Sequence, residues 1–383
     1  MYSTSLPIDP TLAGQLLERA DTICHSVLHD RNVLDLPYAS LSAGAAAAAT
    51  LMAHGAIALD RPRYADYAYE LMDHALSRMD LGAWSLFGGS TGLALCALQL
   101  DALLDSDEYS RSLDDYDEVL RAGLSRPWAG HYDLVSGLCG IGVYSVARAS
   151  RQGDHTLVDT VFAHLEAMSS FQGERQYWAT TPAMMPWSPM WQRLNTDMVW
   201  DVGMAHGNAG VSALLAKAIE REVAPASATT MLRNSIAWLR ACEMPRSADG
   251  AFPNLIGDPN PSRGAWCYGD FGVGNALLLA GHALEDASLS DDGVRVLRAA
   301  CLRSEASLQV DNPWLCHGHA GLAHLLNRTF RACGADELLQ RAGSFYQQAL
   351  CSEAAHMYGP QERTTWSFLD AYSGERDQPF RRT

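Results

Sequence analysis

Two short segments of this 383-residue chain carry cysteine just before a glycine, and one of them also carries histidine. They read Trp-Cys-Tyr-Gly at 266–269 and Trp-Leu-Cys-His-Gly at 314–318. The thiolates of Cys267 and Cys316 and the imidazole of His317 would supply three ligands of a tetrahedral zinc ion with the fourth position open, as in catalytic zinc sites. The spacing matches no zinc finger or ribbon, so the fold must bring the segments together. If the fold does not bring them together, Cys267, Cys316 and His317 are core residues.

A repeated motif offers a way to bring them together. A Gly-x-x-Gly pair followed by an apolar, helix-like run occurs five times, and weaker copies near Ser42 and Asp370 bring the count to seven. Successive pairs start 48, 70, 62 and 49 residues apart, which is room for two helices and their connections. The five pairs are Gly89/Gly92, Gly137/Gly140, Gly207/Gly210, Gly269/Gly272 and Gly318/Gly321.

Each repeat is therefore predicted to be a helical hairpin, and the fold class to be all-α. Residues 60–79 and 228–244 space their apolar residues as amphipathic helices do. The alanine-rich run from Leu41 to Leu59 is interpreted as a buried helix and not as a membrane span. If the array closes into one domain over residues 1–383, all the glycine turns meet at one end and form the floor of an active site.

Glycines three residues apart at the start of a helix can serve two purposes. They permit close backbone approach, or they leave the helix N-terminus open toward a cavity. A plain packing contact between helices is the simpler interpretation for any single pair. Five pairs in the same setting favour a shared role at the predicted floor.

Residues 171–200 depart from the repeat pattern. They contain three prolines, four tryptophans and four methionines without a helical period. We interpret this segment as an insertion and expect any β-structure to lie there or at the termini. It could cover a helix pair as a lid, or it could bind an extended peptide through its aromatic and methionine side chains.

Three motifs in this order resemble those of the lanthionine synthetase C-like (LanC) family. They are Ala-His-Gly-x-x-Gly at 205–210, Trp-Cys-Tyr-Gly-x-x-Gly at 266–272 and Cys-His-Gly-x-x-Gly at 316–321, and the resemblance covers nearly the whole chain. It implies an α/α toroid of seven inner and seven outer helices. It also implies Zn²⁺ held by Cys267, Cys316 and His317. His319 is a competing ligand, but it lies inside the turn.

The resemblance implies catalytic roles for four further residues. His206 matches the family's motif histidine, Asp133 its aspartate before the second strong glycine pair, Arg263 its arginine four residues before the first ligand, and Tyr268 the tyrosine after that ligand. On residue chemistry alone, Asp133 and Arg263 could instead form an ion pair between repeats, and His206 could be a core histidine.

The implied activity is that of a zinc-dependent cyclase, a lanthionine synthetase. It would add cysteine thiols of a precursor peptide to dehydroalanine or dehydrobutyrine, with His206 as proton donor, Asp133 orienting it and Arg263 or His206 stabilising the enolate. Alternatives are glutathione addition to dehydroamino acids, a peptide-binding scaffold without turnover, and a glycosidase. A glycosidase needs paired carboxylates, for which Asp133, Asp201 and Asp270 are available.

Charge and composition indicate which partners the protein can bind and in which compartment it works. A net charge of −16 argues against a nucleic-acid partner, because phosphate binding needs a surplus of Lys and Arg. The first twenty residues lack the pattern of a signal peptide, no transmembrane segment is found, and nine scattered cysteines fit a reducing compartment, so we expect a cytoplasmic protein. With no kinase or lyase segment in the sequence, we expect it to act on a peptide dehydrated by a separate dehydratase.

Overall fold

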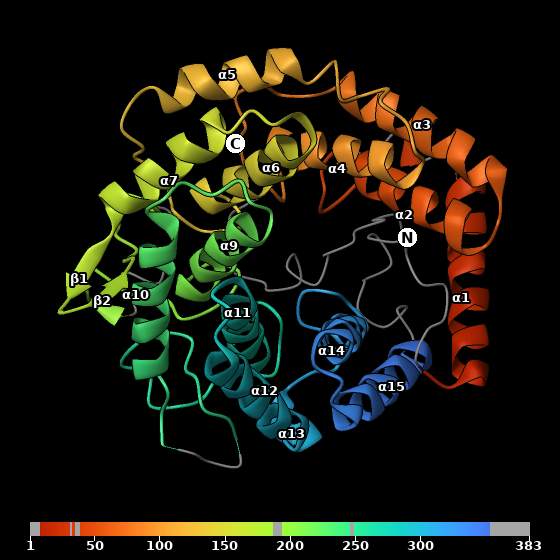
Figure 1. Cartoon of the computed structure of the whole chain (residues 1–383). Coiled ribbons are helices and arrows are strands. Elements are labelled where there is room, and N and C mark those ends of the chain that lie inside the picture. Colours follow the sequence, from red (N-terminus) through yellow and green to blue (C-terminus); the bar gives the residue numbers. More distant parts are fainter. Residues whose placement is uncertain (1–7, 31–32, 35–38, 187–193, 246–248, 353–383) are drawn as a thin grey trace. The chain divides into compact units, whose positions relative to one another are not determined.

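The structure is a computed structural model that describes residues 8–30, 33–34, 39–186, 194–245 and 249–352. Within these ranges its regular secondary structure is almost entirely helical (Figure 1). The predicted seventh repeat copy, near Asp370, lies outside the described residues.

Fourteen α-helices are found in the described ranges, and most follow one another as hairpins. Their bounds are α1 (Pro10–His29), α2 (Ala45–Ala58), α3 (Pro62–Leu76), α4 (Ser90–Leu103), α5 (Asp114–Leu124), α6 (Leu138–Gln152), α7 (Thr156–Met168), α9 (Asn208–Glu220), α10 (Ala228–Ala241), α11 (Asp270–Ala283), α12 (Ala287–Cys301), α13 (Glu305–Leu308), α14 (His319–Cys333) and α15 (Asp336–Cys351).

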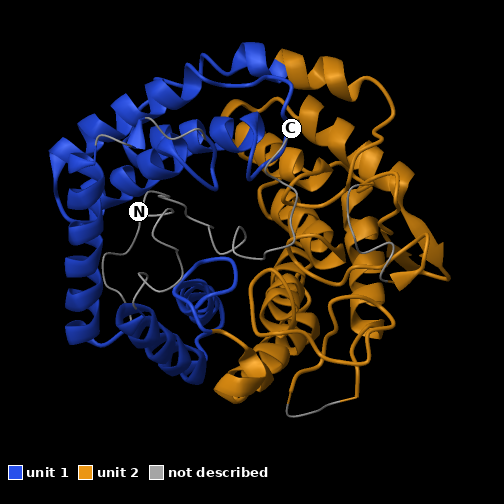
Figure 2. Cartoon of the chain, turned by 180° about the vertical axis from the view of Figure 1, so that it is seen from behind, with its two compact units in different colours: residues 1–117, 311–376 blue, residues 118–310, 377–383 orange. Residues whose placement is uncertain are grey.

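The chain divides into two compact units (Figure 2). Unit 1 comprises residues 1–117 and 311–376; in it α2 packs against α3 and α4, α14 against α15, and α1 against α2 and α15. Unit 2 comprises residues 118–310 and 377–383; in it α6 packs against α7, α11 against α12, and α9 against α6, α10 and α11. The hairpin predicted for each repeat is thus the building element of both units.

The first helix of each hairpin begins directly after a glycine. This holds for α2, α4, α6, α9, α11 and α14, whose N-cap residues are Gly44, Gly89, Gly137, Gly207, Gly269 and Gly318. These helices are buried over most of their length, as α4 and α9 show. The second helices, such as α3 and α12, bury only one face. The repeat therefore alternates a buried helix with an amphipathic one.

The glycine pairs serve close backbone approach. The amide of the first helical residue donates to a carbonyl seven residues earlier, as from Ser90 to Ala83 (2.7 Å) and from Asn208 to Asp201 (2.9 Å). The turn therefore folds back over the helix start. A Cβ at the second glycine would collide with the carbonyl oxygen six residues earlier, as at Gly210 against Met204. Because turn carbonyls accept these amides, the helix N-terminus is closed.

The predicted helices and the predicted place of β-structure agree with the structure. Residues 60–79 and 228–244 contain α3 and α10, and the run from Leu41 to Leu59 contains the buried α2. None of the described helices is long and apolar enough to cross a membrane. The two strands, β1 (Ser170–Gln172) and β2 (Arg175–Tyr177), form an antiparallel hairpin that starts one residue before the predicted insertion.

Candidate functional site

Three glycine turns of unit 2 lie side by side and are joined by backbone hydrogen bonds. The turn before α6 meets the turn before α9 where the Leu134 amide donates to the Ala205 carbonyl over 3.1 Å. The turn before α9 meets the turn before α11 where the amides of Met204 and Ala205 donate to the Cys267 carbonyl over 2.8 and 3.1 Å. In these repeats the turns meet as the sequence predicted.

The structure pairs His206 with Asp133. Nδ1 of His206 lies 2.5 Å from Oδ2 of Asp133, and the other carboxylate oxygen accepts from the backbone and hydroxyl of Ser136 over 2.9 and 3.0 Å. The Asp133 side chain is 1% exposed and that of His206 is 12% exposed. Because the carboxylate can only accept, Nδ1 of His206 carries a proton.

Burial and charge act in opposite directions on this pair. Burial alone would raise the pKa of Asp133, but its contacts with His131 and His206 outweigh burial and hold that pKa well below its usual range. Burial alone would lower the pKa of His206, but the hydrogen bond and charge of Asp133, with Asp201 and Cys267, raise it overall. The pair therefore favours an imidazolium beside a carboxylate.

A second pair joins Tyr268 to Asp201. The Tyr268 hydroxyl lies 2.9 Å from Oδ2 of Asp201, whose Oδ1 accepts the Gly203 amide over 2.7 Å. Burial raises the pKa of Asp201. The rings of Tyr268 and His206 are 6.2 Å apart at their centroids, so the two pairs are neighbours. Sequence reasoning had placed Asp201 only among the glycosidase carboxylates and missed this contact.

Arg263 lies beside the first predicted metal ligand. Its Nη2 atom is 3.9 Å from Sγ of Cys267, which is 1% exposed. Asp133 and Arg263 therefore do not form the ion pair that was the alternative, because the Asp133 carboxylate is bonded to His206 and Ser136. The arginine adds a positive charge next to a thiol that would be a thiolate in a metal site.

The other two predicted ligands lie in unit 1, in the turn before α14. Cys316 is 6% and His317 7% exposed. Oδ1 of Asn312 accepts the Trp314 amide over 3.1 Å, and the His319 amide donates to the Asn312 carbonyl over 2.8 Å. His319 is the first residue of α14, and its ring lies 6.0 Å from that of Phe345 on α15.

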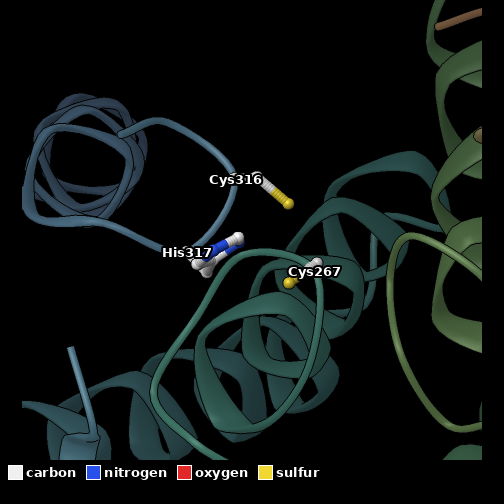
Figure 3. A group of neighbouring side chains, drawn as sticks. All are labelled: Cys267, Cys316 and His317. Carbon is white, nitrogen blue, oxygen red and sulfur yellow. The ribbon is translucent and has the colours of Figure 1, made fainter. Parts of the chain in front are cut away.

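Cys267, Cys316 and His317 form a candidate metal site (Figure 3). One ligand atom from each of them lies within 4.8 Å of the other two, and His319 is outside this group. Ligand atoms around a tetrahedral zinc lie roughly 3.5 to 4 Å apart. Nδ1 of His317 is buried without a hydrogen-bond partner among the described residues. Two thiols and an unsatisfied imidazole fit zinc.

A polar residue six positions before the N-cap glycine recurs and could have revealed part of this arrangement. His131, Asp201 and Asn312 hold this place, and the side chain of each accepts the amide two residues later. An alignment of the repeats on their glycines would have placed Asp201 beside the turn that carries His206.

The three aspartates considered for a glycosidase are all engaged elsewhere. Asp133 pairs with His206, and Asp201 with Tyr268. Asp270, whose pKa is raised by burial, accepts the amides of Ala251 and Phe252 and contacts Arg303 over 3.3 Å. No two of these carboxylates share a partner that would set them up as acid and base, so the geometry does not favour that alternative.

Comparison with known proteins agrees with the resemblance drawn from the motifs. A family model described as "Lanthionine synthetase C-like protein" matches residues 38–374. The nisin biosynthesis protein NisC of Lactococcus lactis subsp. lactis is 25% identical over 340 residues, which covers 81% of this chain and 76% of that protein. The solved structure of a nisin cyclase matches with a TM-score of 0.72 and 20% identity, covering 93% of this chain and 92% of the other.

These matches confirm two predictions made from the sequence. The likeness in fold to nisin cyclase confirms the all-helical fold class, the helical toroid of LanC proteins. The two relatives also indicate an enzyme of the lanthionine synthetase type. Because the family model spans most of the sequence, the chain belongs to the lanthionine synthetase C-like family.

Proposed function

We propose that this chain is a zinc-dependent cyclase that forms lanthionine or methyllanthionine rings in a lanthipeptide precursor. The observation that carries the proposal is the convergence of Cys267, Cys316 and His317 within 4.8 Å, in a chain whose relatives are named for nisin biosynthesis and nisin cyclisation. A zinc ion held there would lower the thiol pKa of a substrate cysteine, so that a thiolate exists at neutral pH.

The protein's own residues would serve the addition of that thiolate to the dehydroamino acid. A carbon–sulfur bond forms at the β-carbon, and negative charge moves to the amide oxygen as an enolate. Arg263 supplies positive charge beside Cys267 to stabilise it. His206, held through Nδ1 by Asp133, would deliver a proton from Nε2 to the α-carbon. The Tyr268 hydroxyl is directed at Asp201, which makes His206 the better proton donor.

The direct test is consumption of thiols by the purified protein. With a dehydrated precursor peptide, the protein should remove free cysteine thiols one by one, which is followed by alkylating the remaining thiols and measuring mass. Cyclisation itself changes no mass, so only the alkylated product reports it. Binding of the peptide with all thiols retained, in the presence of zinc, would instead support a scaffold.

The closest alternative activity would use the same residues on a different thiol substrate. A protein that adds glutathione to dehydroamino acids would show a mass increase of one glutathione per site without loss of peptide thiols. Incubating a dehydrated peptide that lacks cysteine with glutathione therefore separates the two activities. We expect no adduct under conditions where the cysteine-containing peptide is cyclised.

The raised pKa of His206 predicts how the rate depends on pH. If the imidazolium donates the proton, kcat should fall as pH rises through the His206 pKa, which Asp133 raises. In the variant Asp133→Asn the carboxylate charge is lost while burial, which lowers the pKa, remains. The falling limb of the profile should then move to lower pH. A limb at the same pH in both proteins would mean that another group donates the proton.

The remaining proposals concern partners and compartment. The enzyme would receive its peptide from a separate dehydratase, since the reaction consumes dehydroamino acids that a dehydration step must supply. We further propose that it works in the cytoplasm, where nine cysteines without a disulfide framework stay reduced. In the described residues all nine are free thiols.

A further inference from the structure

Trp178 and Thr180, in the predicted insertion, are buried against the turns that carry Asp133 and His206. Trp178 is 0% and Thr180 2% exposed. The indole Nε1 of Trp178 donates to the Leu165 carbonyl at the end of α7 over 2.7 Å. Trp178 and Thr180 therefore belong to the core of unit 2.

Thr180 fixes the ring of His131 in the Asp133 turn. Nδ1 of His131 accepts the Asp133 amide over 2.9 Å, so this nitrogen carries no proton and Nε2 does. Nε2 then donates to the Thr180 hydroxyl over 2.9 Å. That hydroxyl is also 3.5 Å from the Tyr132 oxygen, which can accept its proton. The Asp133 amide thus sets the tautomer of His131, and Thr180 sets the orientation of its ring, which in turn holds the Asp133 backbone.

The segment from Trp178 to Thr180 is also hydrogen-bonded to the His206 turn and to the residues before it. Oδ1 of Asn208 accepts the Trp178 amide over 2.8 Å, and its Nδ2 donates to the carbonyls of Trp178 and Asp201 over 3.0 and 2.8 Å. Thr180 and Val199 exchange two backbone hydrogen bonds of 2.9 and 3.0 Å. Since Asn208 follows His206 by two positions, Trp178 and Thr180 connect the His206 turn to the Asp133 turn.

We propose that Thr180 and His131 are positioning residues for the His206–Asp133 pair. Neither needs to touch substrate. They hold the Asp133 turn where its carboxylate accepts Nδ1–H of His206, and this role rests on the proposed function of that pair. Nothing in the sequence pattern marks Thr180, because its segment has no period from which a place in the fold could be predicted.

The variant Thr180→Val keeps the shape of the side chain and removes the acceptor for His131. We expect kcat for thiol consumption to fall roughly 10- to 100-fold, the range typical of losing a group that orients a functional ligand, with KM and zinc content unchanged. Thr180→Ser, which keeps the hydroxyl, should restore kcat to within about threefold. Thr181→Val, at the half-buried next position, should leave kcat unchanged.

A double-mutant cycle separates positioning from a general loss of stability. In a His206→Asn background, Thr180→Val should cost less than about threefold, because the pair it positions is already gone. A full additional loss there, or a parent-like kcat for Thr180→Val alone, would overturn the proposal.

A spectroscopic reading tests the same proposal without turnover. The His206 Nδ1 proton, bonded to Asp133 at 2.5 Å, should give a far-downfield NMR signal that moves upfield in Thr180→Val and returns in Thr180→Ser. If the parent consumes no thiols, the proposed function fails, and this signal alone decides the positioning. An unchanged signal in Thr180→Val contradicts it.

Discussion

Replacing Cys316 with alanine should abolish both zinc retention and cyclisation. The parent should carry about one zinc per chain, since Cys267, Cys316 and His317 provide the three protein ligands of an open tetrahedral site. Removing one thiolate leaves two ligands, which is too few to hold the ion through purification. Metal analysis of the purified variant, with thiol consumption measured alongside, checks both parts.

The matched control is another buried cysteine in the same unit. Cys96 is fully buried in α4, and burial raises its thiol pKa to about 12, so it is an inert core thiol. Cys96→Ala should lose some stability through the missing sulfur but keep its zinc and its activity. Full zinc occupancy in Cys316→Ala would place the metal elsewhere, whatever the control shows.

The sequence allowed the candidate metal ligands to be predicted because they sit in equivalent places of a repeat. Cys267 lies two residues before the cap of α11, and Cys316 two residues before the cap of α14. Each helix start is fixed by a glycine that only a close backbone approach explains, as at Gly272 and Gly321. Because the turn repeats, equivalent positions in the sequence take equivalent places at the start of each helix.

Residues whose roles depend on contacts across the fold could not be found this way. Asp201 bonds to a tyrosine 67 positions later, and Thr180 to a histidine 49 positions earlier. Neither pair shares a helix face or a motif, so no periodicity connects them. The burial of Trp178 could not be predicted for a related reason. A tryptophan in an irregular segment suggests an exposed surface, but here its indole is buried against α7.

The partner of Asp133 also could not be predicted from residue types. From types alone, Asp133 could equally have joined Arg263 in an ion pair, because both are charged and precede glycine turns. The structure resolves this through the backbone bonds that fix the order of the turns: the Asp133 turn meets the His206 turn at Leu134, and the His206 turn meets the Cys267 turn at Ala205. Asp133 thus lies next to the histidine.

His206→Asn should separate catalysis from metal binding. Asparagine is similar in size, and its amide can still donate to Asp133, so thermal stability should change little. Zinc content should stay at the parent level, because the three candidate ligands lie in other turns. Thiol consumption should nevertheless fall by about two to four orders of magnitude, the range typical of losing a general acid or base.

The outcome of His206→Asn is informative in each direction. If the variant cyclises at the parent rate, His206 is a core histidine that happens to pair with Asp133, and the proton must come from elsewhere. Tyr268 would then be the next candidate, and its hydroxyl would have to leave Asp201 to donate. A parent-like rate in His206→Asn together with inactivity in Tyr268→Phe would establish this second route.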